Sequence, residues 1–439
     1  MVTIHFKPAG RRWVLLLPAL LAILGGWFVA RWYVGNTVAE YGPGVEEGGV
    51  DMARLATRWA PADPLTHWRL GSLEEKTFSV ENMAAAVREY QLAVALSPND
   101  YRYWMELGRA LEASGDREGG ERALRRAVDL APAYSHPRWY FGNLLLREGK
   151  LEEAFGQLGR AAEADDLMRP QVFGLAMQVF GGDVNEIARV ATGSPAGRMK
   201  FAIYLSSKGK FDDAMRVWAT VSPADRRAQS DLVAELKKAL LVARQFHYAI
   251  EVTREGGSDL PQPGQFWNGG FENSPAPPGT NSFDWVINSR PQALISIDSQ
   301  AHSGHSSLRL VFKANNLERI QVSQVVVVEP GAQYRFECFV RTDGLSSAST
   351  PILVIRDAVD NAVLGQAKPV ATGTNEWQQV TFDFKTNPKH DGIIVGFDRA
   401  ACEDAKICPI FGTIWYDDFN LQRIDGPGSS RGESGSTKR

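Results

Sequence analysis

Hydrophobic and polar positions follow three different patterns along the chain. From Trp13 to Ala30, eighteen consecutive residues carry no charge. Residues 50–255 repeat apolar positions at helical spacing, and residues 265–424 alternate apolar with polar positions. An uncharged run of this length is typical of a membrane-spanning helix. Apolar positions at helical spacing are typical of packed helices, and alternating positions are typical of half-buried strands. The sequence therefore predicts a multi-domain protein with a transmembrane helix, an all-α region and an all-β region.

The apolar run is long enough to cross a bilayer. Eighteen helical residues rise about 27 Å, close to the hydrocarbon thickness of roughly 30 Å. Snorkelling by Arg31 would extend the span, so we assign it to residues 13–34. Residues 1–12 are basic and the first charges beyond Arg31 are acidic. Basic flanks stay in the cytoplasm, so residues 1–12 are expected there and the bulk of the chain outside it.

Two other readings of this run stay open. A cleaved signal peptide has a shorter apolar core and a small-residue exit, for which Thr37-Val38-Ala39 would serve although it comes late. A buried core helix is the second alternative, and the basic flank directly before the run argues against it.

Residues 50–255 contain a repeat of about 34 residues. In the unit that starts at Tyr101, large, small and turn-forming residues occupy the defining places: Trp104, Leu107, Gly108, Leu111, Gly120, Leu124, Ala127 and Pro132. The unit that starts at Ser135 matches at Phe141, Gly142, Leu145, Ala154, Leu158 and Ala161, with Gly149 at the turn between its helices. Residues 67–98, 169–194, 201–223 and 232–254 are weaker or degenerate units.

This pattern resembles the tetratricopeptide repeat. Small residues let the two helices of a unit approach closely, and large residues fill the space between neighbouring units. Each unit buries its apolar face only against the next, so several must stack. The resemblance implies a superhelix whose concave surface holds peptides or partner proteins. A spacer without a ligand is the alternative.

Residues 265–424 read as a β-sandwich. Leu308, Leu310 and Phe312 alternate with Arg309, Val311 and Lys313, and similar alternation recurs in several short segments separated by polar turns. A turn-rich linker precedes this region at residues 256–264, and residues 425–439 read as a flexible tail.

Five short motifs punctuate this region in order. They are Asn268-Gly269-Gly270-Phe271-Glu272, Ser303-Gly304-His305-Ser306-Ser307, Pro330-Gly331-Ala332-Gln333-Tyr334, Asn375-Glu376-Trp377-Gln378-Gln379 and Trp415-Tyr416-Asp417-Asp418-Phe419. In order and spacing they resemble carbohydrate-binding modules of the family 4/9 type. The resemblance implies a jelly-roll, galactose-binding-like fold.

The same resemblance implies a structural calcium ion. Its acids match Glu272 and Asp417 in this chain. Counting by twos along the last strand gives Asp417 the inward parity of Phe419 and Leu421, and a buried carboxylate needs a partner. Calcium accepts carboxylate oxygens. A hydrogen-bonded carboxylate at a strand end is the alternative.

Glycan binding requires exposed aromatic rings and polar side chains that reach hydroxyl groups. The candidates are Trp267 and Phe339 with the polar residues Arg341, Gln324 and Asp357. Trp285 and Trp377 occupy places that are core packing in the family, so we expect them inside the sandwich. Because fold does not fix function, a sandwich that binds protein or serves only as structure remains an alternative.

Composition narrows the partners. The formal net charge is −3, whereas nucleic-acid-binding proteins are usually basic, so no nucleic acid is expected. Three cysteines exclude a four-cysteine zinc site. Outside the cytoplasm Cys402 and Cys408 are expected to form a disulfide, with two free thiols as the alternative, and Cys338 is expected to be a buried thiol.

The search for catalytic residues finds none. Asp417 and Asp418 are neighbours in a strand and point to opposite faces, unlike the facing carboxylates of a glycosidase. Residues 428–432 match G-x-S-x-G within a glycine- and serine-rich tail that lacks the strand and helix this motif needs. His302 and His305 lie in a turn, and we read them as solvated loop residues rather than metal ligands.

These patterns predict a non-enzymatic protein of the bacterial inner membrane, with its bulk in the periplasm. The helical repeats would dock protein partners and the sandwich would bind a glycan. The pairing of these domains suggests a role in biogenesis or export of a surface polysaccharide. The alternative is a purely structural scaffold whose sandwich binds no sugar.

Overall fold

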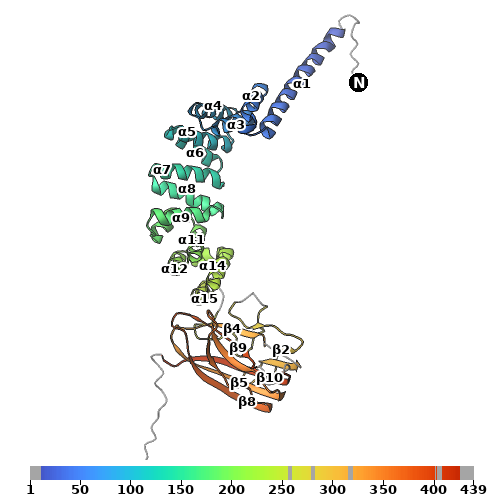
Figure 1. The fold of residues 1–439 in the computed structure, drawn as a ribbon, viewed down its shortest axis with the longest axis vertical. Coiled ribbons are helices and arrows are strands. Elements are labelled where there is room, and N and C mark those ends of the chain that lie inside the picture. Colours follow the sequence, from blue (N-terminus) through green and yellow to red (C-terminus); the bar gives the residue numbers. More distant parts are fainter. Residues whose placement is uncertain are drawn as a thin grey trace, which may run out of the picture. The chain divides into compact units, whose positions relative to one another are not determined.

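The computed structural model describes residues 11–255, 260–277, 282–314, 320–400, 402 and 408–425. The chain forms two compact units, Met1–Tyr204 and Leu205–Arg439. We describe each unit by itself (Figure 1). The predicted tail falls at residues 426–439 outside the described residues, as do residues 1–10 and residues 256–259 of the predicted linker.

Helix α1 (Arg11–Tyr41) is longer than the predicted span of residues 13–34. Its segment Leu16–Tyr41 is apolar and long enough to cross a membrane. The side chains from Leu16 to Val34 are mostly exposed, whereas Gly35 and Ala39 are buried. The apolar surface of α1 therefore ends where its contacts with the following helices begin.

The rest of the first unit is built of helices. They are α2 (Gly49–Trp59), α3 (Pro64–Glu75), α4 (Val80–Leu96), α5 (Tyr101–Ala113), α6 (Arg117–Leu130), α7 (Ser135–Arg147), α8 (Leu151–Ala164), α9 (Arg169–Val179), α10 (Val184–Ala191) and α11 (Pro195–Ser207), the last of which crosses the boundary of the unit. A short 3-10 helix, Val45–Glu47, precedes α2. Polar caps set several starts, because Ser79, Asp100 and Asp116 accept hydrogen bonds from the first backbone amides of α4, α5 and α6.

The predicted repeats form helical hairpins, namely α3–α4, α5–α6 and α7–α8 (Figure 1). The glycines at the close contacts have no room for a side chain: a Cβ on Gly108 would lie 2.6 Å from Leu124, and one on Gly142 would lie 2.6 Å from Leu158. Gly149 has φ +75°, which favours glycine at the turn between α7 and α8. The sequence pattern thus located the helix contacts correctly.

The second unit continues with helices and ends in a β-sandwich. The helices are α12 (Phe211–Ala219), α13 (Pro223–Ala228), α14 (Ser230–Val242) and α15 (Phe246–Glu255). The strands are β1 (Val286–Ile287), β2 (Ala293–Asp298), β3 (Ser307–Ala314), β4 (Val322–Val327), β5 (Gln333–Ser346), β6 (Ile352–Asp357), β7 (Val363–Gln366), β8 (Gly373–Lys385), β9 (Gly392–Asp398) and β10 (Ile410–Arg423).

The strands form two antiparallel sheets. Sheet A has the order β1-β4-β9-β6-β7 and sheet B the order β2-β3-β10-β5-β8. Apolar side chains from both sheets form one core, as the alternation predicted, with Leu308, Leu310 and Phe312 almost fully buried. Trp285 belongs to this core, as expected. Trp377 is only half-buried, and its ring lies against His302 rather than in the core.

The predicted inward orientation of Asp417 is wrong, because β10 contains a β-bulge. The pairing of β10 with β5 shifts between Asp417 and Asn420, and Asp418 has φ +52°. The inward positions are therefore Ile414 and Tyr416 before the bulge and Phe419 and Leu421 after it. Asp417 lies on the outer side of sheet B, and it is buried there by the loop that contains His302.

Candidate functional site

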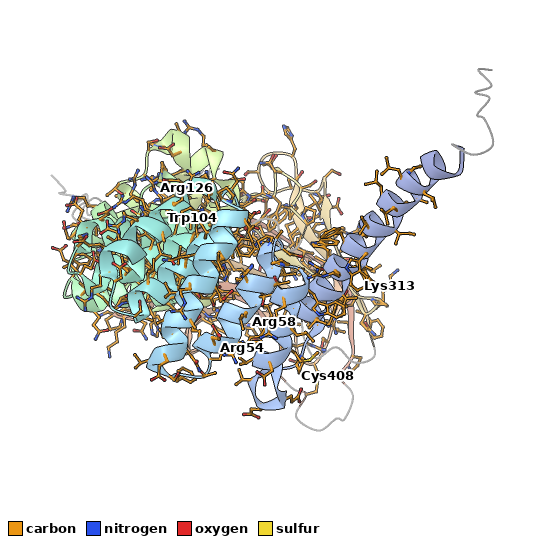
Figure 2. All side chains as sticks on the ribbon, turned by 90° about the horizontal axis from the view of Figure 1, so that it is seen from above. Arg54, Arg58, Trp104, Arg126, Lys313 and Cys408 are labelled. Carbon is orange, nitrogen blue, oxygen red and sulfur yellow. A yellow bond between two sulfur atoms is a disulfide. The ribbon has the colours of Figure 1, made fainter. Side chains whose placement is uncertain are left out.

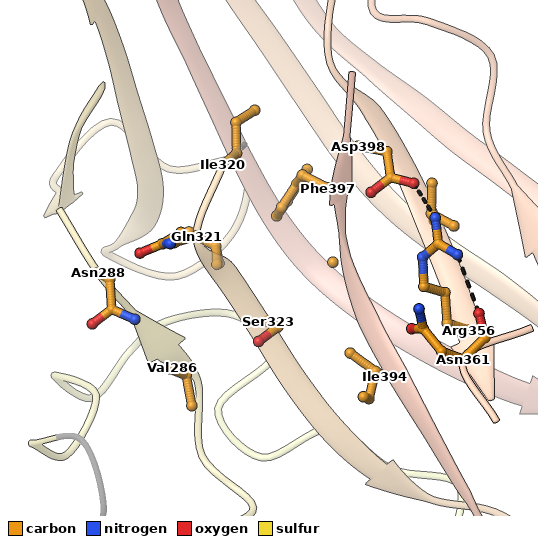
Figure 3. Close-up of a pocket in the computed structure, with 13 residues that line it drawn as sticks. Val286, Asn288, Ile320, Gln321, Ser323, Arg356, Asn361, Ile394, Phe397 and Asp398 are labelled. Carbon is orange, nitrogen blue, oxygen red and sulfur yellow. Dashed lines mark hydrogen bonds and ion pairs between the residues drawn. The ribbon is translucent and has the colours of Figure 1, made fainter. Parts of the chain in front are cut away.

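A hollow of about 440 Å³ lies on the outer side of sheet A (Figure 3). Its residues come from β1, β4, β6 and β9 and from adjoining loops: Val286, Asn288, Ile320, Gln321, Val322, Ser323, Val354, Arg356, Asn361, Ile394, Gly396, Phe397 and Asp398. We call it the sheet A cleft.

Gly396 leaves the floor of the sheet A cleft open. It pairs with Ser323 on β4 and with Val354 on β6, so it lies between the two neighbouring strands. A Cβ built on Gly396 would meet the Val322 oxygen at 3.4 Å and the Ser323 Cβ at 3.8 Å, which are ordinary contacts. The floor is low because this residue has no side chain, and a larger residue would project into the hollow.

The polar rim of the cleft is ordered by an ion pair. Arg356 pairs with Asp398, and Arg356 Nη1 donates to the backbone oxygen of Asn361 at 3.2 Å (Figure 3). Asn288 and Gln321 add side-chain amides on the other side of the cleft (Figure 3). Such groups present both donors and acceptors, as sugar hydroxyls require. The one aromatic residue in the lining, Phe397, is only 6% exposed, so this cleft offers hydrogen bonds rather than a stacking platform.

Aromatic rings gather instead on the outer side of sheet B. The ring of His302 stacks on Phe339 with centroids 3.6 Å apart, and the ring of Trp377 meets His302 edge-on at 5.6 Å. The Arg341 guanidinium lies 5.5 Å from the Trp415 ring, and Arg341 also pairs with Glu376. We call this group the sheet B aromatic surface.

The five predicted glycan-binding residues do not meet at one place. Phe339 and Arg341 share the sheet B aromatic surface. Gln324 has the inward parity of β4, is 1% exposed, and its amide donates to the backbone oxygen of the half-buried Trp267 at 2.8 Å. Asp357 is also 1% exposed. The amide of Gln324 and the carboxylate of Asp357 are therefore both buried and do not lie at the surface.

Asp357 organises the turn between β6 and β7. Its carboxylate accepts hydrogen bonds from the amides of Val359 and Asp360 at 2.7 and 3.2 Å and contacts His390 Nδ1 at 2.9 Å. One ligand-type atom each from Asp357, Asp360 and His390 lies within 4.8 Å of the others. The hydrogen bonds within the turn account for this cluster, so it does not by itself define a metal site.

Glu272 and Asp417 are brought to one corner of the sandwich. Both hold the loop 302–306 through its backbone: Asp417 accepts from the amides of His302 at 2.8 Å and Ser303 at 3.2 Å, and Glu272 accepts from those of His305 at 2.9 Å and Ser306 at 3.2 Å. The two acids therefore clamp opposite ends of one loop.

Carboxyl groups gather at this corner of the sandwich. Asp417 is fully buried, and desolvation raises the pKa of its carboxyl above the usual value. Asp418 is adjacent and pairs with His302. A Cβ on Gly270 would lie 3.8 Å from Asp417 Oδ1 and 4.0 Å from Glu272 Cγ, so both acids lie close to this glycine. The carboxylate set fits a calcium ion in its chemistry, while the amide donors already satisfy much of its hydrogen bonding.

The cysteines lie as the sequence analysis expected. Cys402 and Cys408 form a disulfide. Cys338 is a buried free thiol, and burial raises its pKa far above the usual value, so it is inert.

Comparison with known proteins shows that part of the second unit is similar to a family of carbohydrate-binding domains. Residues 264–399 match the family of carbohydrate-binding domains of type 4/9, described as "Carbohydrate binding domain". This match includes the sheet A cleft and Glu272 but ends before Asp417. No curated protein sequence gives a significant match to the chain.

Several solved structures are similar to separate parts of the chain. A structure titled "CBM4 structure and function" is 16% identical, covers 36% of this chain and 99% of its own, and has a TM-score of 0.28. MamA from Desulfovibrio magneticus RS-1 is 14% identical over 44% of this chain and 93% of its own, with a TM-score of 0.28. The xylan-binding domain CBM22-1 of Paenibacillus barcinonensis Xyn10C is 10% identical over 32% and 86%, with a TM-score of 0.23.

The chain therefore combines an apolar N-terminal helix, tetratricopeptide-like helical hairpins and a sandwich similar to carbohydrate-binding modules. Sequence reasoning missed the residues of the sheet A cleft. Ile394, Gly396 and Asp398 alternate in β9 and thereby share its outer face. This alternation can be read from the sequence, but the prediction of a glycan site depended on aromatic residues, and Ile394, Gly396 and Asp398 are not aromatic.

Proposed function

We propose that this protein is a non-catalytic, membrane-anchored protein of the bacterial envelope that binds a glycan through its sandwich and a partner protein through its helical repeats. Its setting would be biogenesis or export of a surface polysaccharide. The sheet A cleft carries the proposal, because an open floor at Gly396 and a polar rim around Arg356 suit a hydroxylated chain lying across the strands.

The match of residues 264–399 to carbohydrate-binding domains supports the same reading. Sugar hydroxyls would pair with the rim amides and with the ordered Arg356–Asp398 pair, while the half-buried Ile394 would contact the apolar faces of the sugar rings. Recognition would depend mainly on hydrogen bonds, because the described lining lacks an exposed ring.

Protein docking is proposed for the helical repeats. A hollow of about 430 Å³ opens between α3, α5 and α7, lined in part by Arg109, Trp139, Tyr140 and Asn143. The Arg109 guanidinium lies 5.1 Å from the Tyr140 ring centroid. Aromatic rings, an amide and fixed charges at one place are the groups that anchor a peptide segment.

Calcium is proposed as a structural ion at Glu272 and Asp417. A bound cation would offset the negative charge of the buried Asp417 and of its neighbour Asp418. The ion would fix the 302–306 loop and with it His302, which stacks on Phe339. Its role would be structural, without any chemical step.

The proposed location follows from α1 and the cysteines. An uncleaved span with basic residues 1–12 on its inner side would leave the remainder in the periplasm. The disulfide between Cys402 and Cys408 agrees with an oxidising compartment.

Replacing Gly396 tests glycan binding directly. Gly396→Val should fill the cleft floor, because its Cβ meets only ordinary contacts and the branched side chain suits a strand. Affinity electrophoresis of the detergent-solubilised full chain in gels that contain candidate polysaccharides should show retardation of the wild type and its loss in Gly396→Val. Ser296→Val, an exposed position of sheet B, is the matched control and should be retarded like the wild type.

The alternative is a scaffold whose sandwich binds no sugar. Equal migration of the wild type and Gly396→Val across all polysaccharides, with calcium present, would favour that alternative. Retardation that survives Gly396→Val but is lost in Phe339→Ala would move the site to the sheet B aromatic surface.

A further inference from the structure

Helices α2–α11, which we call the helical array, follow α1 along the chain. The apolar part of α1 continues without a break into the part that packs against this array. Phe28 and Val29 are 65% and 66% exposed, whereas Ala39 is 1% exposed. α1 is one helix from Arg11 to Tyr41, and it packs on both α2 and α3. If the exposed part lies in a bilayer, the first helices of the array must lie at the surface of that bilayer.

Close contacts fix this junction. A Cβ on Gly35 would lie 2.7 Å from the Ala60 Cβ and 3.0 Å from the Ala56 oxygen, so the α1 and α2 backbones nearly touch. Asn36 Nδ2 donates to Asp63 Oδ2 at 2.8 Å. Backbones this close leave little freedom for the array to swing away from α1.

The C-terminal end of α2 lies level with the end of the apolar segment. Arg31 Nη2 donates to the backbone oxygen of Arg58 at 2.8 Å. From Arg31 to Gly35 the helix rises about 6 Å. Arg58 and Trp59 therefore lie roughly one helical turn from the predicted bilayer boundary, and Arg58 lies beside the base of α1 (Figure 2).

α2 also carries a partly exposed apolar stripe beside its buried face. Met52, Leu55 and Trp59 are 38%, 42% and 38% exposed and lie on one face of the helix. The adjoining face, about 100° around the helix, is buried through Ala53 and Ala56. The apolar face of a surface helix normally packs against a neighbour, so the uncovered edge of this face indicates that another apolar phase covers it.

The distribution of charged residues indicates that this apolar phase is a lipid bilayer. The basic residues Arg31 and Arg58 lie at the bilayer end of the junction, and Arg58 is exposed. The acidic residues Glu40, Glu46 and Glu47 lie beyond it, toward the far end of α1 and the start of α2. A basic residue beside an exposed tryptophan matches the headgroup region of an anionic bilayer.

We propose that the α2 stripe of Met52, Leu55 and Trp59, with Arg58 beside it, is a lipid-contact surface that lies against the headgroups of an anionic bilayer. The inference rests on the proposed membrane span of α1. It adds that α2 is part of the membrane attachment, so that the helices that follow leave the bilayer in a fixed direction. Contact should be deepest at Trp59 and shallowest at Met52.

Single introduced cysteines can test this surface in the full chain. Cys338 is buried and the other two native cysteines form a disulfide, so a new exposed thiol can be labelled selectively. Ala62→Cys places a fluorophore in the exposed turn after Trp59, and Ala133→Cys places it in the equivalent turn before α7. The labelled proteins would be inserted in phosphatidylcholine nanodiscs with or without phosphatidylglycerol, and quenching by nitroxide-labelled lipid would be measured.

We expect quenching at residue 62, stronger with phosphatidylglycerol, and none at residue 133. Arg58→Glu in the Ala62→Cys background should reduce the quenching to the level in phosphatidylcholine alone. Equal quenching at residues 62 and 133, or no response to Arg58→Glu, would overturn the lipid-contact surface.

Leu24→Cys separates this inference from the proposed span. A label at residue 24, in the middle of the apolar segment, should be strongly quenched in every nanodisc. Absence of quenching at residue 24 would overturn the span itself. Quenching at residue 24 without quenching at residue 62 would leave the span standing and overturn the surface alone.

Discussion

The exposed Glu272 and the buried Asp417 both bind the polypeptide backbone itself. They hold the 302–306 loop by accepting its backbone amides, and Gly304 between them has φ +64°. A Cβ on Gly304 would lie 2.2 Å from Glu272 Oε1, so the carboxylate can close on the loop only because this residue is glycine. The loop and the acids are therefore one structural element, with or without an ion.

Calcium should raise the melting temperature of the wild type if these acids bind it, because a ligand that binds only the folded state stabilises that state. Asp417→Asn should abolish the calcium-dependent rise, and Asp383→Asn, an exposed position paired with Arg335, should keep it. Differential scanning fluorimetry in calcium and in chelator measures the shift. A wild type that melts identically in both conditions would leave Asp417 as a hydrogen-bonded carboxylate.

His67 gives the helical array a predicted pH dependence. Its Nδ1 lies 2.6 Å from Glu89 Oε2 and its Nε2 lies 3.0 Å from the Pro61 oxygen, so both ring nitrogens face acceptors and the arrangement favours the doubly protonated ring. The hydrogen bond to Glu89 raises the pKa of His67 above its usual value. The stabilisation is therefore complete below about pH 6.5 and is lost as the pH rises through the raised pKa.

Chemical denaturation at several pH values should show this loss. The free energy of unfolding of the first unit should fall as the pH rises above about 6.5. His67→Gln should flatten the dependence, whereas His136→Gln, at an exposed position, should leave it unchanged. A wild-type stability that increases over this range would contradict the assignment.

At the scale of elements, the α7–α8 hairpin contains glycines of two kinds, of which only one sets the spacing of the helices. Gly142 faces Leu158 across the α7–α8 contact, whereas a Cβ on Gly156 of α8 would meet nothing within 4 Å. Gly142→Ala should destabilise the hairpin by about 1–3 kcal/mol through overpacking. Gly156→Ala should stabilise it by about 0.5–1 kcal/mol, because alanine is a better helix former.

Thermal melts of the two variants measure this contrast. The opposite signs of the two shifts are the decisive readout, since both substitutions add the same methyl group to the same hairpin. A stabilising effect of Gly142→Ala would mean that the helices are less closely packed than the contact between Gly142 and Leu158 indicates.

Sequence reasoning succeeded for elements whose pattern is periodic and failed where a single residue breaks the period. The repeat around Gly108 and Gly142 was readable because each hairpin repeats the same contacts. The orientation of Asp417 was wrong, because the bulge at Asp418 shifts the period and no residue type in that segment requires it. Gln324 was misjudged for another reason: polar residues are usually exposed, and here the amide lies inside the sandwich.

At the scale of the whole molecule, the proposed topology gives a simple labelling pattern. A membrane-impermeant maleimide added to spheroplasts should label Ala133→Cys, because the helical array is expected outside the cytoplasm. Lys7→Cys, in the basic segment of residues 1–12, should be labelled only after lysis. Protection of Ala133→Cys in intact spheroplasts would reverse the topology and remove the support for an envelope function.

Because α1 is continuous with its contacts to the array, the rotation of α1 about its own axis sets the direction in which the array projects. Each helical residue turns the chain by about 100°, so one residue inserted between Ala30 and Arg31 would swing the array by that angle about the helix axis. Four inserted residues would return it close to its starting azimuth while lifting it by about 6 Å. Because the helices are in close contact at Gly35, the direction of the array should depend on the helical phase of an insertion rather than on its length.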